Sequence, residues 1–359
     1  MAEVHDQIAQ PDPALVLLFA SPDYDLDRLG AAIASRFQCP VIGCTTAGEL
    51  SSEGYSDGSL VAASLGGGAV IAHVEDLGAL DHFDPRIVAH AADRVRSRLR
   101  LVSDFDPTRL CGLLLIDGLS MREEQVAAHL HEHFPGVRFV GGSAGDGRRF
   151  RETRIYVEGA FRRDRAAFVL LETLVPFEIF RVQRLPADGP QARDHRIRSR
   201  APPRTRDDGG PAPQEYANAV GLDAANVSAH TLSTYPLMLR IGGEYYVRSI
   251  QRVHSDGSLT FFCAIDDGLV LTVAEGVDVV NTLRDGLDDL ARTIPDPALV
   301  IGFDCVLRRL EIERKGLRAP IEEILRGVPI VGFSTYGEQY NAVHINQTFV
   351  GLALGRDAT

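Results

Sequence analysis

Short apolar runs recur along the chain in a fixed order, separated by polar stretches. In three copies, a run of Val, Leu and Ile precedes a segment with helical spacing, a second apolar run, a glycine-rich turn, a polar connection and a third apolar run. The copies span residues 15–66, 112–172 and 298–355. Such runs are typical of strands buried on both faces. We therefore expect an α/β fold of repeated β-α-β-β units, which form mixed sheets covered by helices in two subdomains.

The glycine-rich turn is the clearest part of the repeat. Residues 41–50 read VIGCTTAGEL, residues 330–339 read IVGFSTYGEQ, and a weaker copy, FVGGSAGDG, spans residues 139–147. A structural unit can recur, whereas a catalytic loop usually occurs once. We therefore expect the glycines to serve backbone geometry at strand ends.

Four polar residues of these turns are candidates for ligand binding. Glu49 and Glu338 occupy equivalent places in two copies, as do Thr45 and Ser334. Ligands tend to bind in clefts between subdomains. We predict that the two glutamates face a shared cleft of this kind and contact a ligand together with the two hydroxyl side chains and the turn amides.

The stretch between the second and third copies differs in composition. Residues 187–213 are rich in Pro, Gly, Asp and Arg and lack apolar periodicity, which is typical of a linker or a long surface loop; a docking patch for an acidic partner is the alternative. IGGEYYV, from Ile241, and HSDGSLTFF, from His254, then carry the turn signals of two β-hairpins.

Composition excludes several classes of protein. The 359 residues are 45% hydrophobic and 24% charged, with a net charge of -12, which argues against general binding to nucleic acid or anionic membranes. The five cysteines are scattered without zinc-site spacing, which indicates a reducing compartment. The first apolar run is too short for a membrane span, so we expect a cytoplasmic protein. No output motif is present, so signalling output would lie on another protein.

A hydrolase is an alternative that the sequence does not favour. Residues 141–145, GGSAG, match the nucleophile-elbow pattern, but a polar segment follows where that motif needs a helix. The repeat aligns Ser143 with Thr45 and Ser334, so its hydroxyl belongs to the structural pattern; Cys44 is the other possible nucleophile. We therefore predict that the protein is not an enzyme.

His344 is the most informative histidine. It lies in the polar connection of the third copy, near Tyr336, Tyr340 and Asn346. A neutral imidazole there could ligate iron or bind a ligand, and a hydrogen-bonded loop histidine is the alternative.

Several separate segments together resemble the FIST domain, a sensory module of signal transduction. They are VIGCTTAGEL, GGPAPQEYANAVGL, YPLMLRIGGEYYVRSI, DGSLTFFCAIDDGLVLTVAEG and IVGFSTYGEQYNAVHINQTFVGLALG. They occur in the family's order and span nearly the whole chain. The resemblance implies a FIST N-terminal domain over residues 14–218, which includes the loop 187–213, and a FIST C-terminal domain over residues 219–355.

YYVRSIQRV, FFCAIDDG and FDCVLRRLE are most similar to the nitric-oxide-sensing haem proteins of this family (NosP type). That resemblance implies a cytoplasmic receptor that binds haem b and nitric oxide. The sequence leaves open whether the protein is a monomer or a homo-oligomer. Its partner would be a histidine kinase or a cyclic-di-GMP enzyme, either a diguanylate cyclase or a phosphodiesterase. We take His344 as the expected iron ligand, with His254 and His73 as alternatives, and Tyr336 or Tyr340 beside the haem. Across the family, haem-free binding of a small metabolite such as an amino acid is the competing expectation.

Overall fold

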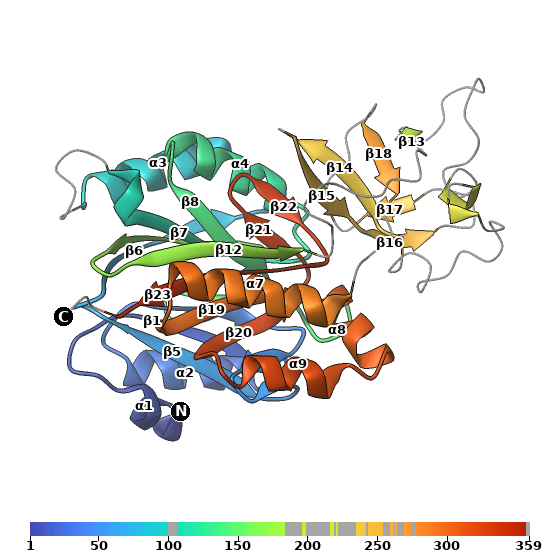
Figure 1. Cartoon of the computed structure of the whole chain (residues 1–359). Helices are drawn as coiled ribbons and strands as arrows, with labels where there is room; N and C mark the ends of the chain where they lie inside the picture. The colour runs from blue at the N-terminus through green and yellow to red at the C-terminus, as the bar shows by residue number, and fades with distance from the viewer. Residues whose placement is uncertain are drawn as a thin grey trace.

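The three repeated units predicted from the sequence are present in the computed structural model (Figure 1). The first unit consists of β1 (Pro13–Ala20), α2 (Leu26–Arg36), β2 (Val41–Thr45), β3 (Glu49–Ser51), β4 (Gly54–Ser56) and β5 (Leu60–Gly66). The second consists of β7 (Leu110–Ile116), α4 (Glu123–His133), β8 (Arg138–Ser143), β9 (Ile155–Val157), β10 (Ala160–Arg162) and β11 (Arg165–Thr173). The third consists of β19 (Pro297–Cys305), α8 (Val306–Arg314), α9 (Arg318–Leu325), β20 (Ile330–Thr335), β21 (Glu338–Tyr340), β22 (Val343–Ile345) and β23 (Thr348–Gly355).

The structure describes most of the chain. The described residues are 1–99, 106–183, 196–198, 216–218, 220–221, 235–241, 243–253, 259–261, 263, 269–273 and 278–356. The predicted loop 187–213 lies outside them except for β13 (Arg196–Arg198), and His254 also lies outside them.

Each large sheet combines three strands of one unit with the hairpin of another. Two further strands, β6 (Val70–Ala79) and β12 (Phe177–Gln183), extend two of the sheets. The strand orders are β10-β9-β2-β1-β5, β22-β21-β8-β7-β11-β6 and β12-β23-β19-β20-β3-β4. The first unit thus receives the hairpin of the second, the second that of the third, and the third that of the first. The sequence indicated only polar connections there, because strands of three residues are too short to show alternation.

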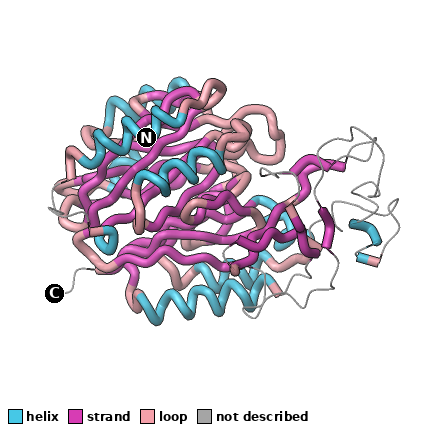
Figure 2. Tube along the Cα trace, turned by 90° about the horizontal axis from the view of Figure 1, so that it is seen from above, coloured by secondary structure: helices cyan, strands magenta, loops and turns pink. Residues whose placement is uncertain are grey.

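Helices cover the outer faces of these sheets, as Figure 2 shows from above. Three of them begin at an aspartate whose side chain accepts a backbone N–H of the first turn, a strong helix-start signal. These aspartates are Asp25 before α2, Asp84 before α3 (Pro85–Arg96), and Asp278 before α7 (Val279–Thr293). A short α1 (Ala2–Ile8) precedes β1.

The central core lies between the sheets. Phe19 of the first unit contacts Phe333 of the third, with ring centroids 4.7 Å apart, and Phe303 lies edge-on to Phe333 at 5.7 Å. All three rings are buried. Since the same cluster also contains side chains of the second unit, the three units share one core.

The described residues between positions 196 and 273 form a separate lobe, which projects from the body beside β21 and β22 (Figure 1). Its sheet has the order β13-β18-β14-β15, where β14 is Leu237–Ile241, β15 is Glu244–Arg248 and β18 is Val270–Val273; β16 (Ile250–Val253) pairs with β17 (Leu259–Phe261). The predicted hairpin at residues 241–244 is confirmed. The two subdomains in space are therefore this lobe and the three-unit body, although the third unit follows the lobe in the chain.

Candidate functional site

The glycine-rich turns that follow β2, β8 and β20 meet at one end of the body. Each turn donates a backbone hydrogen bond to a carbonyl at the end of the second strand of another unit, so the three bonds form a cycle. The bonded pairs, N–H donor first, are Ala47 and Ser334 (2.9 Å), Tyr336 and Ser143 (3.1 Å), and Gly145 and Thr45 (3.0 Å). The motif recurs because each copy holds a neighbouring copy in place.

The cycle creates three related junctions between units. At the junction of the first and second units, a pocket of about 310 Å³ lies between the loop that follows β1 and the loop that joins β8 to β9. Its acidic lining residues are Asp25, Asp27, Asp146 and Glu152. Its basic ones are Arg149, Arg151 and Arg154. The pocket thus offers both signs of charge.

The backbone explains why a pocket forms at this place. The parallel strands β1 and β2 both end here, at Ala20 and Thr45, and the N-terminus of α2 follows. In α/β sheets, ligands bind outside the carboxyl ends of parallel strands. Exposed backbone N–H groups at a helix N-terminus also favour negatively charged ligand groups.

The buried carboxylate of Asp146 organises one wall of the pocket. It accepts backbone hydrogen bonds from Phe150 (2.8 Å), Arg151 (2.9 Å) and Glu152 (2.9 Å). The hydroxyl of Tyr336, from the third unit, also donates to this carboxylate. The loop is therefore held in place without a ligand.

The pocket arginines differ in how they are paired. Arg154 donates from Nε to Glu152 (2.6 Å) and lies 3.7 Å from Asp27, while Arg149 pairs with Asp23. Arg151 is exposed and forms no ion pair with any residue that the structure describes. The side chain of Asp27 is 92% exposed. Arg151 and Asp27 therefore supply one positive and one negative charge that can bind charged groups of a ligand.

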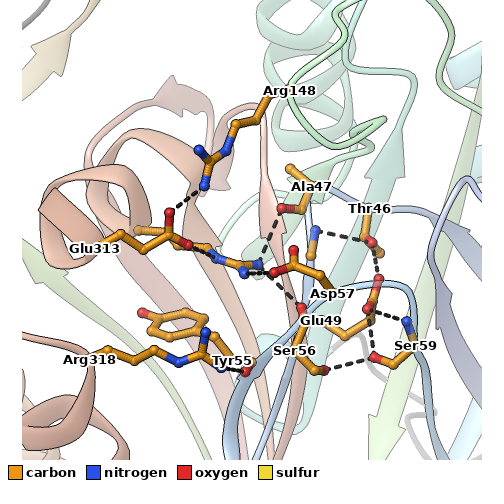
Figure 3. A network of polar contacts seen from close by, with 12 residues as sticks. Thr46, Ala47, Glu49, Tyr55, Ser56, Asp57, Ser59, Arg148, Glu313 and Arg318 are labelled. Carbon is orange, nitrogen blue, oxygen red and sulfur yellow. Dashed lines mark hydrogen bonds and ion pairs between the residues drawn. The ribbon is translucent and has the colours of Figure 1, made fainter. Parts of the chain in front are cut away.

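The corresponding junction of the third and first units is filled by Arg309 of α8. Its buried guanidinium donates to the carbonyls of Ala47 (3.4 Å) and Ser56 (3.3 Å) and to Asp57 (2.7 Å), and its Nε donates to Glu313 (3.0 Å). Figure 3 shows these acceptors converging around one point. An arginine of the chain thus takes the place that is open at the first junction.

A glycine makes room for that arginine. A Cβ at Gly48 would lie 1.6 Å from Nη1 of Arg309. Gly48 and Arg154 are equivalent, since their carbonyls accept from Ser334 (2.7 Å) and Thr45 (2.9 Å) respectively. The second unit thus carries Arg154 at a position where the first carries glycine.

Of the predicted ligand-binding residues, Thr45 lines the pocket. Its hydroxyl accepts a hydrogen bond from the backbone N–H of Arg154 (3.0 Å). Ser334, Glu49 and Glu338 are buried and are not among the pocket's lining residues.

The two glutamates have equivalent structural contacts. Glu49 accepts from the hydroxyl of Thr46 and from the hydroxyl (2.6 Å) and backbone N–H (3.0 Å) of Ser59, as Figure 3 shows. Glu338 accepts from Thr335 and Thr348 in the same way. Each carboxylate thus joins a turn to the start of a later strand. A ligand-binding role for these residues stays a prediction, because their contacts account for the carboxylates without a ligand.

His344 does not fit a haem in this arrangement. The ring is 2% exposed, and its Nδ1 lies 3.2 Å from Nε2 of Gln339. A Cβ at Gly337 would lie 2.2 Å from Cε1 and 2.5 Å from Nε2 of the ring, so backbone occupies the space beside that nitrogen. A haem ligand needs an open nitrogen next to a wide apolar cavity.

The other predicted haem residues that the structure describes are engaged in separate contacts. Tyr336 bonds Asp146, whereas the ring of Tyr340 packs under the guanidinium of Arg181 at 4.9 Å. His73 lies 2.7 Å from a carboxylate oxygen of Glu172. Among the described residues, no cluster of three or more potential metal ligands occurs.

The hydrolase candidates are both buried. The hydroxyl of Ser143 accepts a hydrogen bond from Gln339 (2.9 Å). Burial raises the pKa of the Cys44 thiol well above its ordinary value, which leaves it protonated and unreactive.

The sequence did not reveal Asp146, Arg151 or Arg154 as site residues. They belong to a segment of the second unit that has no counterpart in the turns of the other two units. The basic run RRFR, residues 148–151, was the available signal.

Comparison with protein families agrees with this architecture. Residues 14–191 match the FIST N domain and residues 212–341 match the FIST C domain. No curated protein matches the chain. Within the part of the chain that the structure describes, no helix is long and apolar enough to cross a membrane. The chain therefore belongs to the FIST family, as a sensory protein of signal transduction in which a FIST N domain precedes a FIST C domain.

Proposed function

We propose that this protein senses a small zwitterionic metabolite of the amino-acid class, which binds in the pocket between the first and second units. The bound state is then read by a separate signalling enzyme, either a histidine kinase or an enzyme of cyclic-di-GMP metabolism. The single observation that carries this proposal is that one pocket is lined by two opposite charges, Arg151 and Asp27, neither of which has a close ion pair with a described residue.

The charges suit the two ends of an amino acid. A carboxylate is favoured near Arg151 and near the N-terminus of α2, because both supply N–H donors. An ammonium group is favoured beside Asp27, which has only a distant ion pair with Arg154. The pocket volume of about 310 Å³ lies at the small end of ligand sites, which favours a small metabolite.

Titration calorimetry with the standard amino acids tests the proposal. We expect one or a few of them to bind the wild-type protein saturably. Arg151→Ala and Asp27→Asn each remove one charge without breaking a close ion pair, so we expect each to weaken binding by at least about tenfold, or about 1.4 kcal/mol.

Arg292→Ala is the matched control, because Arg292 is an exposed arginine on α7, outside the pocket lining. It should bind the ligand as the wild type does. If no amino acid binds, or if all three variants bind equally well, the pocket is not the sensory site.

The same protein also tests the haem prediction. A Soret band that moves on adding nitric oxide, and that survives His344→Ala, would favour haem held by residues such as His254. If the protein cannot take up haemin but binds an amino acid, the haem prediction is wrong and the zwitterion proposal is supported.

A further inference from the structure

The third junction, between the second and third units, is filled by an arginine of the lobe. Arg248, at the end of β15, is 1% exposed although it lies on a different subdomain from the groups that it contacts. Its Nη2 donates to a carboxylate oxygen of Glu124 (2.9 Å), and its Nη1 donates to the carbonyl of His344. The lobe therefore inserts a guanidinium into the body.

The acid that binds Arg248 has a counterpart in the open pocket. Glu124 is the second residue of α4, and Asp27 is the second residue of α2. Asp27 lines the open pocket, whereas Glu124 holds a guanidinium. Two junctions of the body thus carry an acid at the second position of the helix, and at one of them this acid binds a guanidinium group.

Among the described residues, the remaining contacts between the lobe and the body are mostly polar, apart from Tyr246, which packs against the central core. The lobe's apolar cluster, which includes Leu237, Leu239 and Leu271, consists of lobe residues only. Ser249 contacts the body by hydrogen bonds with Asn346 (3.5 Å) and Gln347 (3.1 Å). Interfaces of this polar kind allow subdomains to move relative to each other.

Arg181 of β12, in the body, makes two further contacts with the lobe. It forms an ion pair with Glu244 of the lobe (2.8 Å), and its guanidinium lies over the ring of Tyr246, 5.1 Å from the centroid. Glu244 is largely exposed, so this pair adds little to the docking free energy.

Arg248 is also incompletely satisfied in its buried position. Its Nε has no hydrogen-bond partner among the described residues. An unsatisfied buried donor opposes burial of the side chain. A guanidinium group that is free to adjust its position can satisfy this site better than one tethered to β15.

We propose that this junction is a second binding site, specific for guanidinium cations, which Arg248 occupies as an internal ligand. A free guanidinium compound enters in its place, pairs with Glu124 and the carbonyl of His344, and releases the lobe. The site is separate from the pocket of the first junction, and the proposal does not depend on what that pocket binds.

Cys263 reports whether the lobe is docked. Its thiol is 5% exposed, and burial raises its pKa to about 12, with the Arg248 guanidinium acting in the opposite direction. A buried, protonated thiol does not react with alkylating reagents, whereas an exposed one does. Release of the lobe should therefore make Cys263 reactive.

The test is alkylation of Cys263 by iodoacetamide, followed on its own peptide by mass spectrometry. L-arginine should accelerate labelling of the wild type several-fold and saturably, because it displaces Arg248. L-citrulline, which replaces the guanidinium by an uncharged group, should have no effect. Asp27→Asn, which impairs the first pocket, should respond to L-arginine as the wild type does.

Arg248→Ala supplies the complementary measurement. Its Cys263 should label rapidly without any addition, and ethylguanidinium should slow the labelling by filling the vacated place, while ethylurea should not. Wild-type labelling that L-arginine leaves unchanged would overturn the proposal, and so would a response that Asp27→Asn abolishes, since that response would belong to the first pocket.

Discussion

The ring of Phe150 lies stacked on the ring of Tyr336, with centroids 4.4 Å apart and an interplanar angle of 19°. Phe150 has a φ of 51°, a left-handed conformation that a large side chain rarely adopts. The hydroxyl of Tyr336 also bonds Asp146, which holds the same loop. A side chain of the FIST C domain thus stabilises a strained wall of the pocket in the FIST N domain, so a ligand that moves this wall acts on both domains.

Tyr336 variants should separate the two parts of this contact. Tyr336→Phe removes the hydrogen bond to Asp146 and should lower the free energy of unfolding by about 1 kcal/mol. Tyr336→Ala also removes the stacked ring and should cost about 3 kcal/mol. Hydrogen exchange of the backbone N–H groups of residues 150–152 should accelerate in the same order.

Tyr24→Ala is the control, because Tyr24 lines the same pocket but is 41% exposed. It should change the free energy of unfolding by less than about 0.5 kcal/mol. Unchanged exchange at residues 150–152 in Tyr336→Ala would show that Asp146 holds the loop without this tyrosine.

Glycines inside the second strand of each unit should be irreplaceable. A Cβ at Gly332 would lie 1.9 Å from the carbonyl oxygen of Gly302 on the neighbouring strand. Gly43 and Gly141 have equivalent contacts of 2.1 and 2.0 Å with the carbonyl oxygens of Leu18 and Leu114. Gly332→Ala should therefore destabilise the protein by about 3 kcal/mol or more, measured by urea unfolding.

Gly327→Ala is the matched control, since a Cβ there meets nothing within 4 Å. We expect it to unfold at nearly the same urea concentration as the wild type. Equal stability of Gly332→Ala and Gly327→Ala would mean that β19 and β20 can move apart to accommodate a Cβ without a cost in free energy of unfolding. The sequence predicted turn geometry for these motif glycines, and that explanation suits Gly48, whose φ is 124°; the strand glycines are instead required by close backbone approach.

Removal of the buried Arg309 guanidinium should destabilise the protein. Arg309→Met would leave the carbonyls of Ala47 and Ser56 without this donor inside the junction, whereas Asp57 is 72% exposed and Glu313 keeps its pair with Arg148. A buried acceptor that is left unsatisfied typically costs about 1 to 3 kcal/mol, so we expect a loss of about 2 kcal/mol or more in thermal or urea unfolding.

Arg292→Ala again serves as a control, because its ion pair with Asp289 is exposed at both ends. It should change stability by no more than about 0.5 kcal/mol. If Arg309→Met were as stable as this control, apolar packing would be sufficient to close the junction.

The repeated units could be predicted because each strand and helix has a local pattern that its own residues determine. The exchange of hairpins could not, since the pairing of Glu338 with Gly142 joins residues far apart in the chain through backbone groups that carry no sequence signal. The pocket could not be predicted from the sequence for a related reason. Arg154 takes the position of Gly48, but the inserted segment before it obscures this equivalence until the hydrogen bonds are known.

Buried carboxyl groups should make the protein less stable as the pH rises. Burial raises the pKa of Glu338 to about 8 and that of Glu123 to about 7, against an ordinary value of 4.5. Between these values the folded state keeps a proton that the unfolded state releases, so the stabilisation is complete below about pH 4.5 and is lost as the pH rises to about 8. For Glu338 alone the loss is several kcal/mol, with an upper bound of about 5 kcal/mol.

Glu338→Gln tests this assignment, because glutamine resembles the protonated side chain in shape and stays neutral. Its urea midpoint should vary less between about pH 5 and about pH 8 than that of the wild type, and at the higher pH it should be the more stable protein. Glu53→Gln changes an exposed glutamate in the turn between β3 and β4 and should keep the wild-type pH dependence. A wild type that gains stability toward pH 8 would require Glu338 to be ionised in the fold, with Thr335 and Thr348 supplying enough hydrogen bonds to outweigh its burial.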